Sequence, residues 1–232
     1  MEFPQPLERG VLVRRYKRFL ADIVLDRHGP ATAHVANPGA MLGLAEEGAT
    51  VWASPAVAPG RKLAWSLELV ETAAGALVGV NTQLANVLAA EAIAADQVPE
   101  LAGYASMRRE VRVEDGRLDL LLEGGARPRC WVEVKSVTLS RKPGLAEWPD
   151  CVSARSSRQL AGLERLVAAG DRAVLLFVVQ RADCDRFNPA ADLDPTFAAA
   201  LRLAADRGVG VACHAAAVTL SGLRIERSLP LA

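Results

Sequence analysis

Short runs rich in apolar residues follow one another through residues 1–80, and Gly, Pro and Asn stand between them. Branched and aromatic residues in short alternating runs are typical of strands, whereas Gly, Pro and Asn favour turns. Strands are predicted at Gly10–Val13, Phe19–Leu25, Ala31–Val35, Thr50–Ser54, Leu63–Glu71 and Ala76–Val80. Five or six short strands in about eighty residues suit a small closed barrel, so residues 1–80 are predicted to form an OB-like β-barrel domain.

The spacing of apolar residues changes at Asn81-Thr82 from that of strands to that of a helix. A helix is predicted from Gln83 to Asp96, with Asn81 or Thr82 as its cap. Positions i, i+3, i+4 and i+7 share one helix face, and here they are Leu84, Val87, Leu88 and Glu91. Glu91 is therefore predicted to point at the sheet. The alternative is a glutamate at the edge of the apolar stripe that reaches water.

Strand and helix patterns alternate through the rest of the chain. Strands are predicted at Met107–Val113, Arg117–Leu122, Trp131–Lys135, Ala173–Val179, Val209–Ala215 and Leu223–Glu226, and helices at Ala154–Ala169 and from Pro195 to about Arg207. Ser153 and Asp194 cap these helices, and Ser140–Pro149 is predicted as a turn-rich insert. From Gln83 the order is α-β-β-β-α-β and then α-β-β. It predicts an α/β domain over residues 81–232, with helices on both faces of a mixed sheet.

Two of these strands, Arg117–Leu122 and Trp131–Lys135, are separated by a turn-rich segment and are predicted to form an antiparallel hairpin. If the pairing is symmetric about Ala126, Asp119 falls opposite Glu133 with Cβ atoms about 5 Å apart. Alternation places Glu133 and Lys135 on one face. The residues around Asp119 are apolar on both faces of its strand, which indicates that this strand is covered on both sides. A carboxylate there is costly unless it is paired or binds a metal ion.

Two neighbouring carboxylates repel each other unless a cation lies between them. One or two carboxylates with waters and a substrate phosphate are the usual ligands of Mg²⁺. The sequence therefore offers Asp119, Glu133 and Glu91 as candidate ligands of Mg²⁺ or Mn²⁺, and Asp119, Glu133 and Lys135 as candidate catalytic residues. The alternative is a half-exposed hairpin whose polar face carries these residues by chance, because short motifs often match by accident.

The chain has no net charge, with 27 basic and 27 acidic residues, so any contact with nucleic acid must come from local patches. Aromatic residues make up 5%, too few for an extended base-stacking surface. The densest basic cluster is Arg14, Arg15, Tyr16, Lys17 and Arg18. Its cations are predicted to contact DNA phosphates while Tyr16 stacks on a base. Alternation would place Arg14, Tyr16 and Arg18 on one side and Arg15 and Lys17 on the other. The alternative is a solvated strand edge.

A second pair of cations, Arg155 and Arg158, lies three positions apart on the predicted helix and shares a face that could meet a phosphate. The cysteines Cys130, Cys151, Cys184 and Cys213 form no Cys-x-x-Cys pair and have no zinc-ligand spacing to histidine. Scattered thiols without a signal peptide predict a cytoplasmic protein. No apolar run approaches the roughly 20 residues that span a bilayer, so no membrane partner is predicted.

Nearly the whole chain resembles the sugar fermentation stimulation protein A family. The stretches that carry the resemblance, in the same order, are Phe3–Arg9, Arg14–Asp22, Gly79–Thr82, Glu133–Lys135 and Trp148–Asp150. The resemblance implies an OB-like domain joined to a domain like the PD-(D/E)xK nuclease fold, together with DNA binding and control of sugar-utilisation genes. That fold has the core order α-β-β-β-α-β. Its acidic residues would map to Asp119 and Glu133, its lysine to Lys135 and its first-helix acid to Glu91.

Two motifs depart from the family pattern. Family members often show Asn-Thr-Gly-Ser-Met where this chain has Asn37-Pro-Gly-Ala-Met41, and Arg-Gly-Gln-Lys-His where it has Arg155-Ser-Ser-Arg-Gln159. The second change removes a histidine, which argues against that helix as a proton donor. Arg158 keeps a fork of donors for a phosphate.

These observations leave three hypotheses. The first is a DNA-binding protein with a Mg²⁺-dependent site that cleaves phosphodiester bonds. The second is a non-specific DNA-binding regulator of sugar metabolism with an inactive nuclease-like fold. The third is a barrel that binds RNA or a small molecule, fused to a structural α/β domain.

Overall fold

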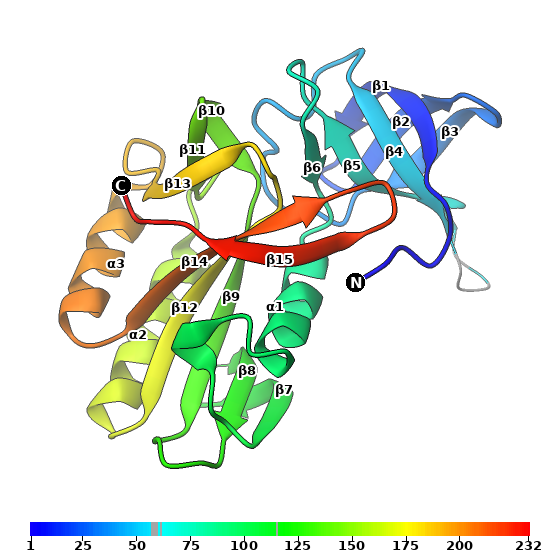
Figure 1. Cartoon of the computed structure of the whole chain (residues 1–232). Coiled ribbons are helices and arrows are strands. Elements are labelled where there is room, and N and C mark those ends of the chain that lie inside the picture. The colour runs from blue at the N-terminus through cyan, green and yellow to red at the C-terminus, as the bar shows by residue number, and fades with distance from the viewer. Residues whose placement is uncertain (57–59, 61, 115) are drawn as a thin grey trace.

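The computed structural model describes residues 1–56, 60, 62–114 and 116–232. The strands of the first part are β1 Glu8–Tyr16, β2 Leu20–Leu25, β3 Gly29–His34, β4 Thr50–Pro55, β5 Trp65–Glu71 and β6 Leu77–Gly79. They hydrogen-bond in the order β3-β2-β1-β4-β5-β6, and a parallel pairing of β3 with β5 closes the sheet into a barrel (Figure 1).

Alternation along the strands fills this barrel. In β2 the even side chains face outward, while Ala21, Ile23 and Leu25 are buried against Leu12 and Val51 from neighbouring strands. Burying one face of each strand is what the period-two pattern requires. The predicted OB-like barrel is confirmed, although β1 is longer at both ends than predicted.

The second part contains a mixed sheet in the order β15-β14-β12-β9-β8-β7. Its strands are β7 Ser106–Val113, β8 Gly116–Glu123, β9 Cys130–Val137, β12 Arg172–Val179, β14 Gly210–Val218 and β15 Leu223–Ser228. The central β9, β12 and β14 are parallel, whereas the pairs at both edges are antiparallel. β12 is buried along almost its whole length, as its apolar run predicted.

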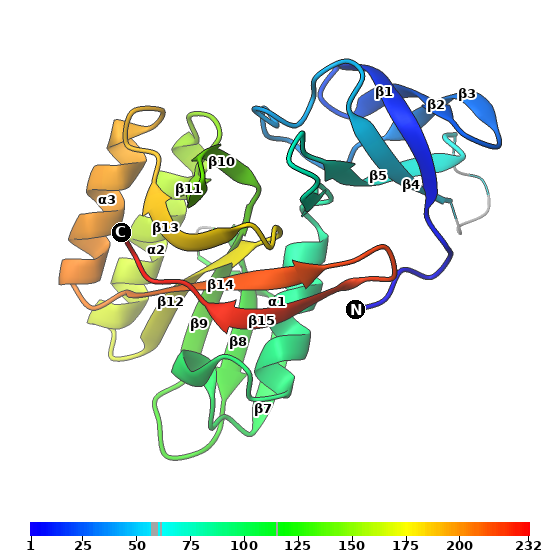
Figure 2. The same ribbon diagram turned by 45° about the horizontal axis from the view of Figure 1, so that its top comes forward.

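Helices cover both faces of this sheet. Helix α1 (Leu84–Ala94) packs on the face that carries Leu120, Val132 and Leu176, while α2 (Ala154–Ala168) and α3 (Pro195–Asp206) cover the opposite face (Figure 2). A short 3₁₀ helix, Pro99–Leu101, follows α1. The observed order α1-β7-β8-β9-α2-β12 is the predicted one, and the α/β domain with a mixed sheet is confirmed.

The predicted insert is more regular than expected. It contains β10 (Leu139–Lys142) and β11 (Gly144–Trp148), and β11 pairs in parallel with β13 (Cys184–Pro189) in a small separate sheet. The prediction of a turn-rich insert was therefore wrong for these residues, and β13 was not predicted. These strands are short and mix polar residues with Gly and Pro, so their sequence resembles that of turns.

The buried face of α1 also differs from the prediction. Its buried residues are Ala85, Leu88, Ala89, Ala90, Ala92 and Ile93, so four alanines share the packed face with Leu88 and Ile93. The buried face of α1 is therefore turned about the helix axis relative to the predicted face, and Glu91 lies on the exposed side. Small side chains allow the helix axis to lie close to the sheet, which a search for large apolar residues does not detect.

Candidate functional site

The site begins where the β8–β9 pairing ends. The ladder pairs Leu120 with Val132 and Leu121 with Trp131, which confirms the predicted register. One step further, the backbone N–H of Val134 donates to Asp119 Oδ2 at 2.8 Å. A side-chain carboxylate thus serves as acceptor for a strand N–H at the end of the ladder. This holds Asp119 beside β9.

A second donor fixes the other oxygen of this carboxylate. Asn86 on α1 donates its Nδ2 to Asp119 Oδ1 at 2.7 Å. Asn86 was not among the predicted site residues. The alanines of α1 were the signal that could have located Asn86. They show which face of the helix packs on the sheet, and Asn86 follows the buried Ala85 at the edge of that face.

Glu133 on β9 is held by a lysine and a glutamine. Lys135 Nζ lies 2.8 Å from Glu133 Oε1 and 2.7 Å from Gln159 Oε1 on α2, and Gln159 Nε2 donates to the same Glu133 oxygen. Glu133 is only 4% exposed. Its Oε2 is buried and has no hydrogen-bond partner among the residues that the structure describes.

Burial dominates the electrostatics of Glu133. It raises the pKa of this carboxyl above its usual value, and the nearby Asp119 charge raises the pKa further, whereas Lys135 and Arg155 oppose the shift. A buried carboxylate with one unsatisfied oxygen is costly unless a proton or a cation reaches it. The surroundings of Glu133 therefore favour an additional positive partner at Oε2.

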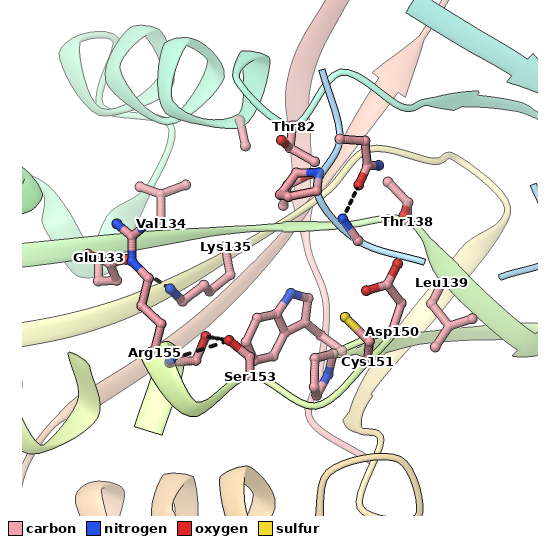
Figure 3. Close-up of a pocket in the computed structure, with 18 of the residues that line it drawn as sticks. Thr82, Glu133, Val134, Lys135, Thr138, Leu139, Asp150, Cys151, Ser153 and Arg155 are labelled. Carbon is pink, nitrogen blue, oxygen red and sulfur yellow. Dashed lines mark hydrogen bonds and ion pairs between the residues drawn. The ribbon is translucent and has the colours of Figure 1, made fainter. Parts of the chain in front are cut away.

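These groups line a cavity of about 520 Å³, here called the hairpin cavity. Asp119, Glu133 and Lys135 contribute to its wall, so the structure brings the predicted trio together. Arg155 lies at the same end as Glu133, and Asp150 lies toward the other (Figure 3). The indole of Trp148 also lines the cavity, with its centroid 5.8 Å from Lys135 Nζ.

The barrel supplies the remaining wall through the loop 37–41. The N–H of Met41 donates to Asp150 Oδ2 at 2.8 Å, across the contact between the two parts of the chain. Gly39 lies against the same carboxylate, and a Cβ at position 39 would come within 2.5 Å of Asp150 Oδ2. Asn37 shapes the loop by accepting from Gly39 N–H and donating to the Val80 carbonyl. Asn37 therefore holds the turn that forms the barrel side of the hairpin cavity.

The basic cluster does not form a continuous DNA surface. Arg14 and Tyr16 both bind Asp22, at 2.8 and 3.1 Å, on the barrel exterior. Arg15 donates to the carbonyl oxygens of loop 37–41, which makes it a support of that loop. The phosphate-contacting role predicted for Arg15 is thus wrong for this structure, because its donors point into the protein.

The predicted alternation through this cluster is also wrong, because β1 ends at Tyr16. Lys17 and Arg18 form the following turn with positive φ values of 47° and 64°. Arg18 donates to the Pro38 carbonyl at 2.8 Å and lines the hairpin cavity. Among the described residues of the predicted barrel cluster, only Arg18 lines that cavity, while Lys17 is exposed in the turn.

Glu91 is not part of the site. Its Oε2 forms an ion pair with the Met1 amino group at 2.6 Å, and its side chain is half exposed. The predicted metal-binding role of Glu91 is therefore corrected: α1 presents Asn86 to the hairpin cavity instead. Arg158, the second predicted cation of α2, lies outside the wall of this cavity.

The chain matches two family models. One, the SfsA N-terminal OB domain, covers residues 13–80, and the other, the sugar fermentation stimulation protein RE domain, covers residues 83–222. The chain belongs to the sugar fermentation stimulation protein family. No helix in the described part of the chain combines the length and apolar character needed to cross a membrane.

Curated relatives and a solved structure agree with this membership. The chain is 53% identical over 232 residues to the sugar fermentation stimulation protein homolog of Rhodospirillum centenum, covering 100% of this chain and 99% of that protein. It is 52% identical to the homolog of Caulobacter vibrioides, covering 99% and 96%. It is also similar to Pyrococcus furiosus SfsA, solved in complex with Ca²⁺, with a TM-score of 0.90, 28% identity and coverage of 100% and 98%.

Proposed function

We propose that this member of the family binds DNA and cleaves it in a reaction that depends on a divalent metal ion. The observation that carries the proposal is the buried, unpartnered Oε2 of Glu133 beside Asp119. Both groups line a cavity that also contains Arg18 and Arg155. Carboxylates for a cation, surrounded by cations for phosphates, form the environment that phosphoryl transfer requires.

The donor set fits Mg²⁺ or Mn²⁺. Its ligands would be the carboxylates of Asp119 and Glu133, and hard oxygen donors are what these ions prefer. No group of three or more His, Cys, Asp or Glu forms a metal cluster in the described residues. Mg²⁺ often binds with one or two carboxylates plus waters and substrate phosphates. The Pyrococcus furiosus relative is described in complex with Ca²⁺, another cation that prefers oxygen ligands. When bound, such an ion would polarise a phosphate oxygen and lower the pKa of a coordinated water.

The other residues would position the substrate. Lys135 can donate from Nζ to a phosphate oxygen once the charge of Glu133 is shared with a cation. Gln159, which bonds both Glu133 and Lys135, keeps these side chains oriented. Arg155 and Arg18 approach the hairpin cavity from α2 and from the barrel, where they can bind the phosphates on either side of the reacting one.

A second candidate is a DNA-binding regulator with an idle site. It is favoured by the closed hydrogen bonds among Glu133, Lys135 and Gln159, which satisfy much of the site without a cation. Gln159 also occupies the position at which the family motif often has histidine, and an amide cannot transfer a proton at neutral pH. Under this candidate function the protein contacts DNA phosphates through the same residues but does not cleave the phosphodiester bond.

Cleavage assays with Asp119→Asn separate the two candidates. We expect purified wild-type protein to cleave labelled DNA when Mg²⁺ or Mn²⁺ is added and not in EDTA. The Asp119→Asn variant should cleave about 100-fold more slowly, because it removes one charge from the metal site. Its DNA affinity should hold or increase, because a negative charge near the phosphates is lost.

The control for this experiment is Asp26→Asn, which changes an exposed carboxylate of the barrel that is paired loosely with Arg9 at 3.5 Å. It should cleave like the wild type. If the wild type and the Asp119→Asn variant are equally inactive with every divalent metal while both bind DNA, the regulatory candidate replaces the nuclease.

Salt dependence tests which barrel cations reach DNA. We expect Arg18→Ala to weaken DNA binding and to reduce the slope of log affinity against log salt by about 0.7–0.9, the value for one lost phosphate contact. Arg14→Ala is the matched control, because Arg14 is engaged with Asp22 away from the hairpin cavity. Titrations at a series of salt concentrations measure both slopes. Equal slopes for the two variants would remove Arg18 from the interface.

A further inference from the structure

We infer that the groove between the end of the β7–β8 pair and α2 is a binding track for single-stranded nucleic acid that continues from the hairpin cavity. This inference rests on the proposed function and extends it, because it specifies the form of the substrate and the path of one flanking strand. We call this groove the helix track. It is a cavity of about 820 Å³, lined by residues of β7, β8 and α2.

The helix track and the hairpin cavity share part of their walls. Arg155 and Gln159 line both cavities. Gln159 also bonds Glu133 and Lys135, so the junction lies directly beside the candidate catalytic residues. No barrel residue lines the helix track among those that the structure describes. A strand whose reacting phosphate lies in the hairpin cavity would therefore leave the barrel behind as it enters the track.

Cations dominate the rim of the helix track. The charged residues that line it in the described coordinates are Arg117, Arg155, Arg158, Arg165 and Glu114. Arg117 forms an exposed ion pair with Glu110 at 2.8 Å, and the exposed Arg158 guanidinium forms no hydrogen bond or ion pair within the described part of the chain. In a protein with no net charge, such a local excess of cations fits an anionic partner. Repeated phosphates along a strand have that charge.

The floor of the helix track is apolar. It contains Val113, Leu118 and Leu166, together with small residues of α2. A duplex keeps its bases paired inside and presents phosphates and sugars, whereas a single strand can lay bases on an apolar floor while its phosphates meet the cationic rim. The combination of an apolar floor with a cationic rim therefore favours a single strand over a duplex.

Gly162 gives the strand room to approach the helix. Glycine inside a helix costs about 1 kcal/mol relative to alanine. Packing does not require it here, because a Cβ at this position would find only the Arg165 side chain, at 3.7 Å. Gly162 lines the helix track midway between Arg158 and Arg165. A bulky residue there would fill the floor without altering any charge.

The length of the track matches a short run of nucleotides. From Arg155 to Arg165 the helix rises about 15 Å. That distance covers about four phosphates of a stacked strand at about 3.4 Å spacing. A four-nucleotide probe can therefore occupy the track or the hairpin cavity but cannot fill both, whereas a twelve-nucleotide probe is long enough to occupy the two together.

Fluorescence anisotropy in EDTA, which prevents cleavage, tests the track with fluorescein-labelled oligothymidylates of four and twelve nucleotides and a twelve-base-pair duplex. We expect the wild type to bind the twelve-nucleotide single strand most tightly. Arg117→Ala combined with Arg158→Ala removes one cation from each wall. It should weaken binding of the twelve-nucleotide strand about tenfold and flatten its salt slope by about 1.4, the value for two lost contacts to a single strand. Binding of the four-nucleotide probe should weaken less, because this probe can still bind in the hairpin cavity.

Three further variants sharpen the result. Arg202→Ala with Arg224→Ala removes two exposed arginines that line neither cavity and should bind like the wild type. Arg117→Lys combined with Arg158→Lys should bind like the wild type, because lysine keeps the charge. Gly162→Leu should weaken binding of the twelve-nucleotide strand, whereas Gly162→Ala should not.

The outcomes separate the track from the nuclease. If the wild type cleaves DNA, and the variant with Arg117→Ala and Arg158→Ala binds the twelve-nucleotide strand as tightly as the wild type, the track is refuted and the nuclease stands. If the wild type binds the duplex as tightly as the single strand, and the variant loses both affinities equally, the single-strand preference is refuted. If the variant weakens binding but the wild type cleaves nothing with any metal, the track stands and the nuclease fails. A wild type that binds none of the probes in EDTA refutes the track, and the cleavage assay with added Mg²⁺ or Mn²⁺ then decides the nuclease by itself.

Discussion

Glu133→Gln should reduce cleavage about 1000-fold and should become more stable relative to the wild type as the pH rises. The loss of cleavage follows from removing a metal ligand and its charge from a buried site. The change in stability follows from burial, which raises the pKa of Glu133 in the folded protein above its usual value of 4.5. Below pH 4.5 the carboxyl is protonated in both the folded and unfolded states, so ionisation contributes nothing there. As the pH rises through the folded pKa, the wild type loses stability that the glutamine variant keeps.

Urea unfolding from about pH 4.5 to about pH 8 in EDTA measures this difference. The matched control is Glu147→Gln, another buried glutamate, whose pKa is lowered by hydrogen bonds from Arg141. Its carboxylate stabilises the folded state above the usual pKa and loses that effect as the pH falls, so this variant should be less stable than the wild type at neutral pH. The two curves should move in opposite directions. A Glu133→Gln curve parallel to that of the wild type would contradict the assignment.

Added Mg²⁺ provides a readout of the same residue that does not depend on activity. A ligand that binds only the folded state raises the free energy of unfolding. The wild type should therefore melt at a higher temperature in Mg²⁺ than in EDTA, and Glu133→Gln should not. An equal shift in both proteins would show that the ion binds elsewhere.

Arg15→Met should destabilise the protein by about 2–4 kcal/mol, because the cost of burying the guanidinium offsets part of the roughly 1.5–3 kcal/mol that each hydrogen bond from a charged donor contributes. The guanidinium donates to the Asn37 and Gly39 carbonyls, both at 2.8 Å, and to the Ala40 carbonyl at 3.0 Å. Methionine keeps the apolar stem and removes the donors. Urea unfolding measures the loss, and Arg14→Met is the control, because the exposed Arg14–Asp22 pair should contribute less than about 1 kcal/mol. Equal losses in the two variants would refute the loop-supporting role of Arg15.

The hairpin could be predicted because two independent patterns agree. The apolar runs indicate the strands, and the turn-rich segment between them indicates the register. The register is well defined because a slip of one residue would turn every side chain to the other face. Asp119, Glu133 and Lys135 could therefore be placed together without a structure. The barrel followed from its series of short apolar runs separated by turns, and the mixed sheet followed from the alternation of strand and helix patterns.

The residues that were missed or misplaced depend on partners that carry no sequence signal. Arg15 binds backbone carbonyls of a loop more than twenty residues away, and any residue type offers a carbonyl. Glu91 was misplaced because alanines form most of the packed face of α1, and a stripe of alanines is weak beside leucine and valine. Gln159 was noticed only as a departure from a motif, and its bonds to Glu133 and Lys135 required the strand and helix to be placed in three dimensions.

The contact between Gly39 and Asp150 limits how such proteins can exchange parts by recombination. A barrel that carries any side chain at position 39 would bring its Cβ within 2.5 Å of the carboxylate at position 150. A recombination crossover near residue 80 would join the barrel of one relative to the second domain of another. Such a hybrid is tolerated only where the residue at position 39 leaves room for the one at position 150. These two positions are therefore expected to be inherited as a pair, and hybrids that separate the pair should be less stable, because the Asp150 carboxylate would have to move away from the Met41 N–H.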